Sequence, residues 1–129
     1  MTATEALATW RSLVRDASAP YRRSGRLAWH FARGKLRWDP VFAHVLARGV
    51  IAPRSRVLDV GCGQGLLASL LAAAARAARD GRWPHGWAEP PLDVRVHGIE
   101  VQRREVERAR EALGDSCEIV CADMRSAPF

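Results

Sequence analysis

The strongest constraint on the fold is the segment VLDVGCGQG, residues 57–65. A short, mainly apolar run leads directly into glycines at positions 61, 63 and 65. The apolar run predicts a short buried strand. Glycines at alternate positions let the backbone turn sharply and let a ligand lie against the main chain. The segment therefore predicts a strand, a glycine-rich loop and the N-terminus of a helix, in that order.

The spacing of the glycines argues against a dinucleotide site. The dinucleotide-binding fingerprint is GxGxxG, in which the third glycine allows close packing of the helix on the strand. Here the third glycine is Gly65, and Leu66 stands where that fingerprint requires glycine. The GxGxG loop counts against NAD as a cofactor.

Strand and helix patterns alternate after residue 55. We expect a helix over residues 66–79, a long loop over 80–93 with three prolines, a second strand that ends at Glu100, a helix over 103–113 and a third strand over 118–122. This alternation predicts parallel strands joined by right-handed crossovers. The predicted fold class is α/β, a Rossmann-like doubly wound parallel sheet whose first three strands lie in the order 3-2-1.

The first 54 residues show only helical patterns, so we divide the chain into an N-terminal helical cap, residues 1–54, and an α/β part, residues 55–129. A first helix starts with a capping box at Thr2 and Glu5 and ends before Pro20. A second helix is expected over residues 21–33, with Leu27 and Phe31 on one face and Gly34 as its end. A third starts at Asp39-Pro40 and ends at Gly49.

Charge is distributed unevenly along the chain. The formal net charge is +6, and residues 1–56 hold eleven Lys or Arg against three acids. A basic face of this kind attracts acidic substrates or nucleic acid. The excess of basic residues has a second explanation. All but one of the twenty are arginine and alanine is abundant, which is typical of a GC-rich coding background. Nucleic acid remains a less favoured partner than a small molecule.

The chain lacks the signals of export and membrane insertion. Its 129 residues leave room for one domain, and its longest apolar run stops at Arg76, short of a membrane span. The first twenty residues lack a basic stretch followed by an apolar one. Three cysteines without a CxxC pair predict neither a disulfide framework nor a metal site. We expect a cytoplasmic protein that does not bind membranes or metals.

Three motifs resemble those of the class I S-adenosylmethionine-dependent methyltransferases. VLDVGCGQG is similar to their first motif, VHGIE (residues 96–100) to their second strand with its terminal acid, and CADMRSAPF (residues 121–129) to the segment that closes the adenine pocket. They occur in the family's order at the ends of successive strands, and the resemblance covers residues 55–129. It implies S-adenosylmethionine as the cofactor and a methyltransferase as the function.

The resemblance also assigns roles to individual residues. It implies that the loop glycines cradle the methionine part, that Asp59 holds the ammonium group and that Glu100 binds both ribose hydroxyls. It places Asp123 at the adenine amino group and Met124 beside the ring. The full set of expected cofactor-binding residues in this part of the chain is Asp59, Gly61, Cys62, Gly63, Gly65, Glu100, Val101, Asp123 and Met124.

Three further candidates come from the helical part. Tyr21 is expected to cover the sulfonium through a cation–π contact, and Arg33 or Lys35 to pair with the methionine carboxylate. The alternative is a basic amphipathic helix that packs on the sheet through its aromatic residues.

The sequence stops at Phe129, where the resembled family continues into a fourth strand. We therefore expect the N-terminal, cofactor-binding half of a methyltransferase, truncated before that strand, that acts on a small molecule. The methyl acceptor and the catalytic residues are unknown. The alternative is a binding module, either a non-catalytic cofactor-binding remnant or a basic nucleic-acid or protein partner. We also expect self-association through the strand edge that truncation exposes.

Overall fold

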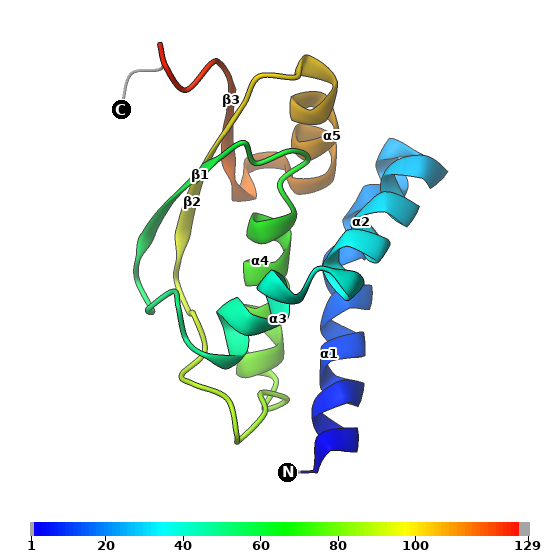
Figure 1. The fold of residues 1–129 in the computed structure, drawn as a ribbon, viewed down its shortest axis with the longest axis vertical. Coiled ribbons are helices and arrows are strands. Elements are labelled where there is room, and N and C mark those ends of the chain that lie inside the picture. The colour runs from blue at the N-terminus through cyan, green and yellow to red at the C-terminus, as the bar shows by residue number, and fades with distance from the viewer. Residues whose placement is uncertain (1, 127–129) are drawn as a thin grey trace.

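A computed structural model describes residues 2–126 of the chain. Its elements, in chain order, are helix α1 (Ala3–Ser18), the 3-10 helix η1 (Ala19–Ser24), helices α2 (Arg26–Trp38) and α3 (Pro40–Ala47), strand β1 (Arg56–Val60), helix α4 (Leu66–Arg79), strand β2 (Arg95–Glu100), helix α5 (Arg103–Leu113), the 3-10 turn η2 (Gly114–Ser116) and strand β3 (Glu118–Cys121). Figure 1 shows their arrangement.

The strands form one parallel sheet in which β2 lies between β1 and β3. Val57 stands beside Val96 in the β1–β2 pair, and Gly98 beside Ile119 in the β2–β3 pair. Helix α4 connects β1 to β2 and α5 connects β2 to β3, as parallel pairing requires. The predicted α/β class with a parallel sheet is confirmed, and this arrangement is compatible with a Rossmann-like fold.

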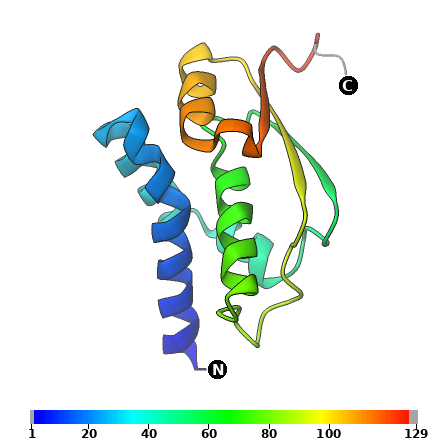
Figure 2. The same ribbon diagram turned by 180° about the vertical axis from the view of Figure 1, so that it is seen from behind.

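All the long helices lie on one side of the sheet. In Figures 1 and 2, α4 lies between the strands and α1, and α5 continues the layer of α4. Helices α1 and α2 with η1 form the outermost layer. The opposite face of the sheet is not covered by any helix of residues 2–126.

The larger of two hydrophobic clusters in the described residues joins the N-terminal helices to the α/β part. It contains Leu13 of α1, Leu36 of α2 and Leu46 of α3 together with Leu70 of α4. A buried polar contact adds to it, because the Ser69 hydroxyl donates to the Ala17 carbonyl at 2.6 Å. The helices α1, α2 and α3 therefore pack in the same hydrophobic cluster as α4 and the sheet.

Local signals in the sequence correctly located several helix ends. Thr2 and Glu5 form the expected capping box, with hydrogen bonds of 2.6 and 3.1 Å. Asp39 caps α3 by accepting from the Val41 amide at 3.1 Å. Helix α4 spans the predicted residues 66–79, and the segment 80–93 contains neither helix nor strand. None of the helices in the described part of the chain is long and apolar enough to span a bilayer.

The prediction for the second helix was wrong in its bounds and its buried face. The chain first forms η1, turns at Gly25 with a φ of 101°, and then runs as α2 through Gly34 to Trp38. Leu27 is 77% exposed, and the buried positions of α2 are Ala28, Ala32 and Leu36. The small alanines let α2 pack closely against α1 and η1, and this packing decides the face and the length of the helix.

Strand β1 is also less buried than predicted. Its side chains alternate, so that Val57 and Asp59 face the helices while Leu58 and Val60 face outward. Leu58 remains 50% exposed. The difference arises because only one face of the sheet is covered by helices within residues 2–126.

Candidate functional site

The glycine loop lies at the carboxyl end of β1, where ligands of open parallel sheets bind. Gly61 and Gly63 adopt φ angles of +70° and +56°, which favour glycine. A Cβ atom built on Gly61 meets no atom within 4 Å, and one on Gly63 comes only to 3.9 Å of the Glu105 carboxylate. Both positions therefore offer bare backbone beside open space, as a ligand cradle requires.

Gly65 has a different function from the other two. It also has a positive φ, of +81°, but a Cβ atom there would lie 2.7 Å from Leu113 and 3.2 Å from Ile119. The glycine permits close packing of the start of α4 against α5 and β3. The expected cradle thus consists of Gly61 and Gly63, and Gly65 supports it from behind.

Residues of the N-terminal helices hold the loop in place through Gln64. The Tyr21 hydroxyl donates to the Gln64 carbonyl at 2.8 Å, and the Gln64 side-chain amide donates to the Ala28 carbonyl of α2 at 3.2 Å. Gln64 and Tyr21 are both buried, and burial raises the pKa of the Tyr21 hydroxyl above its usual range. Because Tyr21 is 0% exposed, it braces the loop and does not face a ligand in this conformation.

Glu100, at the end of β2, joins the loop to the next strand. Its carboxylate accepts from the Gly63 amide at 3.0 Å and from the Gln102 amide at 2.8 Å. Each carboxylate oxygen can accept a second hydrogen bond, so the group can hold both the loop and a ligand. The side chain is buried and therefore has a well-defined position.

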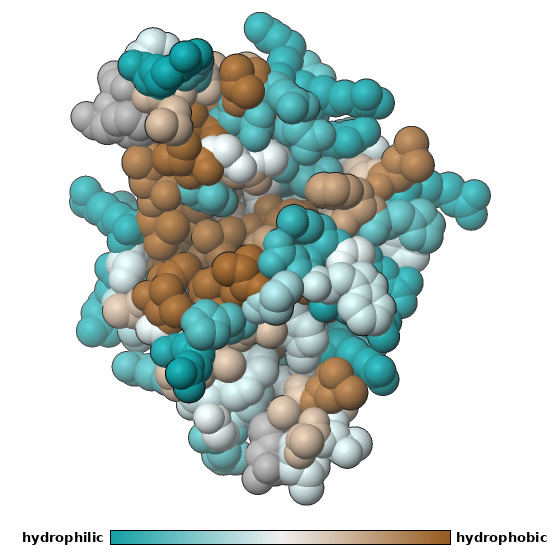
Figure 3. Space-filling model, viewed as in Figure 1, coloured by the Kyte–Doolittle hydropathy of each residue, from teal (hydrophilic) through white to brown (hydrophobic). Residues whose placement is uncertain are grey.

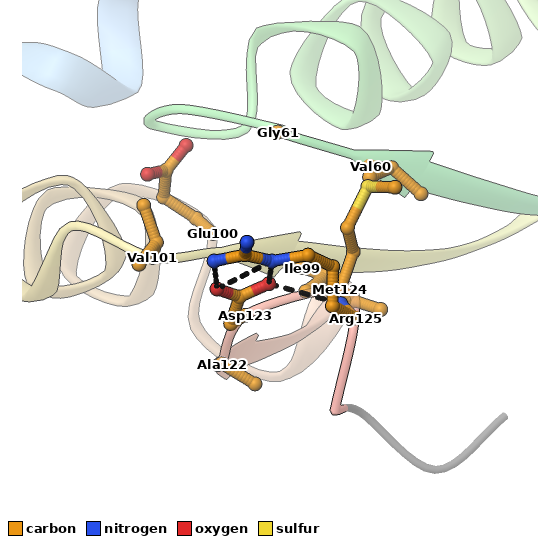
Figure 4. Close-up of a pocket in the computed structure, with 9 residues that line it drawn as sticks. All are labelled: Val60, Gly61, Ile99, Glu100, Val101, Ala122, Asp123, Met124 and Arg125. Carbon is orange, nitrogen blue, oxygen red and sulfur yellow. Dashed lines mark hydrogen bonds and ion pairs between the residues drawn. The ribbon is translucent and has the colours of Figure 1, made fainter.

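A first pocket of about 310 Å³ lies beside Glu100, beyond the ends of the three strands. Figure 4 shows Glu100 and Val101 at one end of it, Val60 and Met124 at the other, and Asp123 between them. Pairing with Arg125, at 2.6 Å, lowers the pKa of the Asp123 carboxyl. The pocket combines exposed apolar side chains with two carboxylates. Residues 127–129 of the third predicted motif lie outside the described residues.

A second pocket of about 410 Å³ lies on the other side of the loop, against α2 and α3. Its walls are mainly apolar, with Phe31, Phe42 and Leu66 among them, and Gly61 borders both pockets. Helix α4 starts here, and no side chain caps its first amides. Such amides attract a negatively charged group.

Asp59 supplies a negative charge to the second pocket. It is half-buried, and burial raises the pKa of its carboxyl. Among residues 2–126, no Lys, Arg or His lies within 4 Å of this carboxylate. A half-buried carboxylate without a cation is suited to bind a positively charged ligand group.

Cys62 borders the same pocket, but its side chain packs against Gly98 of β2. A Cβ atom on Gly98 would lie 2.7 Å from the Cys62 Sγ atom, so Gly98 provides the space for the thiol. Burial, with smaller contributions from the charges of Asp59 and Glu100, raises the pKa of this thiol to about 12. A raised pKa keeps the thiol protonated at neutral pH, which disfavours a role as a nucleophile.

Arg33 does not reach the loop pockets. It lines a separate groove between α1 and α2, and its guanidinium lies 5.6 Å from the centre of the Trp29 ring. Lys35 does line the second pocket, where it pairs with Asp39 at 2.7 Å. Of the two predicted partners for a methionine carboxylate, the structure brings only Lys35 to the site.

Sequence reasoning missed Gln64 and the apolar walls Phe31 and Phe42. Gln64 reads as a spacer between glycines, and only its buried contacts with η1 and α2 reveal its role. The signal for Phe31 was its spacing of four residues from Lys35, which places both on one face of a helix.

No protein-family model matches the chain, and a search of curated proteins finds no sequence match.

Proposed function

We propose that this chain is the cofactor-binding part of an S-adenosylmethionine-dependent methyltransferase that acts on a small molecule. The observation that carries the proposal is the position of Gly61 between two pockets. One pocket contains the acids at the ends of β2 and β3, and the other contains Asp59 and the start of α4. A ligand with a nucleoside half and a zwitterionic amino-acid half matches this division.

The first pocket suits the adenosine half. Glu100 is assigned to the two ribose hydroxyls, because its carboxylate retains acceptor capacity beyond its two backbone contacts. Val101 and Met124 expose apolar surface on which the adenine ring packs. Asp123 accepts from the adenine amino group, and Arg125 must share or release the carboxylate for this contact.

The second pocket suits the methionine half. Bare backbone at Gly61 and Gly63 allows the ligand to approach closely, and the uncapped amides of α4 favour its carboxylate. Asp59 balances the ammonium group. S-adenosylmethionine, when bound, supplies a methyl group activated by the positive sulfonium.

The chain's own contribution to methyl transfer is positioning. In-line displacement from a sulfonium depends on holding the acceptor and the methyl group in line and excluding water. Apolar walls such as Phe31 and Phe42 would reduce the contact of a bound ligand with water in the second pocket. The same proposal includes a doubly wound domain as the fold. In that domain these strands take the order 3-2-1.

Calorimetric titration with S-adenosylhomocysteine tests the proposal. We expect binding by the wild-type protein and a loss of about 1.5–3 kcal/mol in Glu100→Ala, the scale of hydrogen bonds to a charged group. Glu118→Ala is the matched control, because Glu118 is an exposed acid on the neighbouring strand whose only ion pair within residues 2–126 is with His97. Unchanged affinity in Glu100→Ala would remove the ribose assignment, and equal binding of NAD would contradict the choice of cofactor.

The alternative function is cofactor binding without catalysis. It predicts the same binding of S-adenosylhomocysteine. It differs in predicting no methyl transfer from radiolabelled S-adenosylmethionine. Tight binding without transfer to any of a panel of small-molecule acceptors would favour the non-catalytic module.

A further inference from the structure

A second polar site lies outside the glycine-loop region, in a groove between α1 and α2. The groove has a volume of about 360 Å³. Four arginines line it, Arg11 and Arg15 from α1 and Arg33 and Arg37 from α2. Each pair is separated by four residues, so its members lie one turn apart on the same face of their helix. No acidic residue is among the groove's lining residues in the described part of the chain.

Three of the four arginines contact neutral groups. Arg33 and Arg37 lie over the rings of Trp29 and Trp38, at 5.6 and 4.9 Å, and Arg15 donates to the Ser12 hydroxyl at 3.2 Å. Within residues 2–126 the closest carboxylate to any of the four is that of Asp16, 3.8 Å from Arg15. Aromatic contacts orient a guanidinium without neutralising it. The groove therefore holds four positive charges that are almost uncompensated.

The groove is separate from the proposed cofactor site. Phe31 and Lys35 of α2 line the second loop pocket, whereas Arg33 and Arg37 line the groove. A step of two residues turns a helix by about 200°, so the two sets face opposite sides of α2. A ligand in the groove therefore does not compete for the glycine loop.

We propose that this groove binds a compact polyphosphate group, such as the di- or triphosphate of a small molecule. Like charges around one concave site repel each other, and a multiply charged anion removes that repulsion. Guanidinium forks match the oxygens of phosphate with paired hydrogen bonds. A groove of this volume is the size of a small-ligand pocket, which favours a compact anion over a long polymer.

The test uses tripolyphosphate as the probe in calorimetric titrations at low salt. We expect wild-type protein to bind it and the double variant Arg33→Gln/Arg37→Gln to bind about tenfold more weakly, because the variant loses two of the four charges that pair with the anion. Arg26→Gln/Arg48→Gln is the matched control, because it removes two other exposed arginines that do not line the groove. It should retain affinity within about twofold.

The other outcomes overturn the proposal. Absence of binding by the wild type, or equal losses in the two double variants, would show that the charge is diffuse and that the groove is not a site. Citrate binding as tightly as tripolyphosphate would remove the preference for phosphate. A single-stranded RNA that depends on Arg33 and Arg37 and that tripolyphosphate cannot displace would make the groove a nucleic-acid surface. Circular dichroism of each variant establishes that its fold is intact.

Discussion

The two faces of the sheet have similar residues and opposite surroundings. On the inner face, Val96 and Ile119 are buried against the helices. On the outer face Leu58, Val60 and Val120 are about half-exposed. Figure 3 shows hydrophobic residues gathered on the side of the molecule where the strands lie. Ile99 shares the outer face with Val60 and Val120 but is only 6% exposed, so coverage by helices buries the inner face and leaves most of the outer apolar residues half-exposed.

The largest expected effect is the difference in unfolding free energy between two Leu→Ala variants, one among the helices and one on the outer face of the sheet. Leu70 of α4 is 0% exposed, and Leu70→Ala should cost about 2–5 kcal/mol of unfolding free energy through lost contacts and a cavity. Leu58→Ala, at a half-exposed position, should cost less than about 1 kcal/mol. Urea denaturation of both variants measures the difference. Equal losses would mean that Leu58 is buried in solution.

A buried hydrogen bond gives an intermediate effect. Tyr21→Phe removes the donor to the Gln64 carbonyl and leaves a buried acceptor unpaired, which should lower stability by about 1–3 kcal/mol. Ser55→Ala removes an exposed hydrogen bond to the Ala52 carbonyl, next to β1, and should change stability by less than about 0.5 kcal/mol. Thermal unfolding followed by circular dichroism compares them. If Tyr21→Phe left the stability unchanged, the glycine loop would not depend on its contact with the N-terminal helices.

The smallest expected effect concerns self-association through β1. This strand is at an edge of the sheet, with no strand on its other side within residues 2–126. Its side chains Leu58 and Val60 also leave apolar surface exposed on the outer face. Such edges and faces pair with other copies. We expect the wild type to self-associate at micromolar concentration, and Leu58→Lys to weaken association by about 1 kcal/mol.

Leu27→Lys provides the matched control for association. Leu27 is 77% exposed on α2, and the same substitution there should leave association unchanged. Light scattering over a concentration series measures both variants. A wild-type monomer with slowly exchanging amides on Leu58 and Val60 would contradict association through β1.

Much of the candidate site was predictable because it depends on local chemistry. Positive φ angles at Gly61 and Gly63 follow from their place in a turn between strand and helix. Glu100 could be located because the end of a parallel strand points to the same edge as the glycine loop. The bounds of α4 followed from its alanine-rich pattern and the glycine beyond it.

The positions of Tyr21 and Arg33 were not predictable in the same way. We expected both side chains to contact the cofactor. Tyr21 instead contacts the glycine loop from within the core, and Arg33 lines the groove between α1 and α2. Their positions depend on where α2 starts, and a break at Gly25 with close packing through Ala28 and Ala32 set that point. A shift of one or two residues rotates a helix by 100° or more, so it moves every side chain to another face.

By itself the sequence determined the order of the strands and of most helices and the local chemistry of the glycine loop, because caps, glycines and apolar runs act over a few neighbouring residues. Only the tertiary structure decided which face of each element is covered. It left Leu58 exposed, buried Gln64 as a link between the helices and the loop, and brought four arginines of two helices around one groove. The physical reason is that burial and charge clustering depend on contacts between residues far apart in the chain.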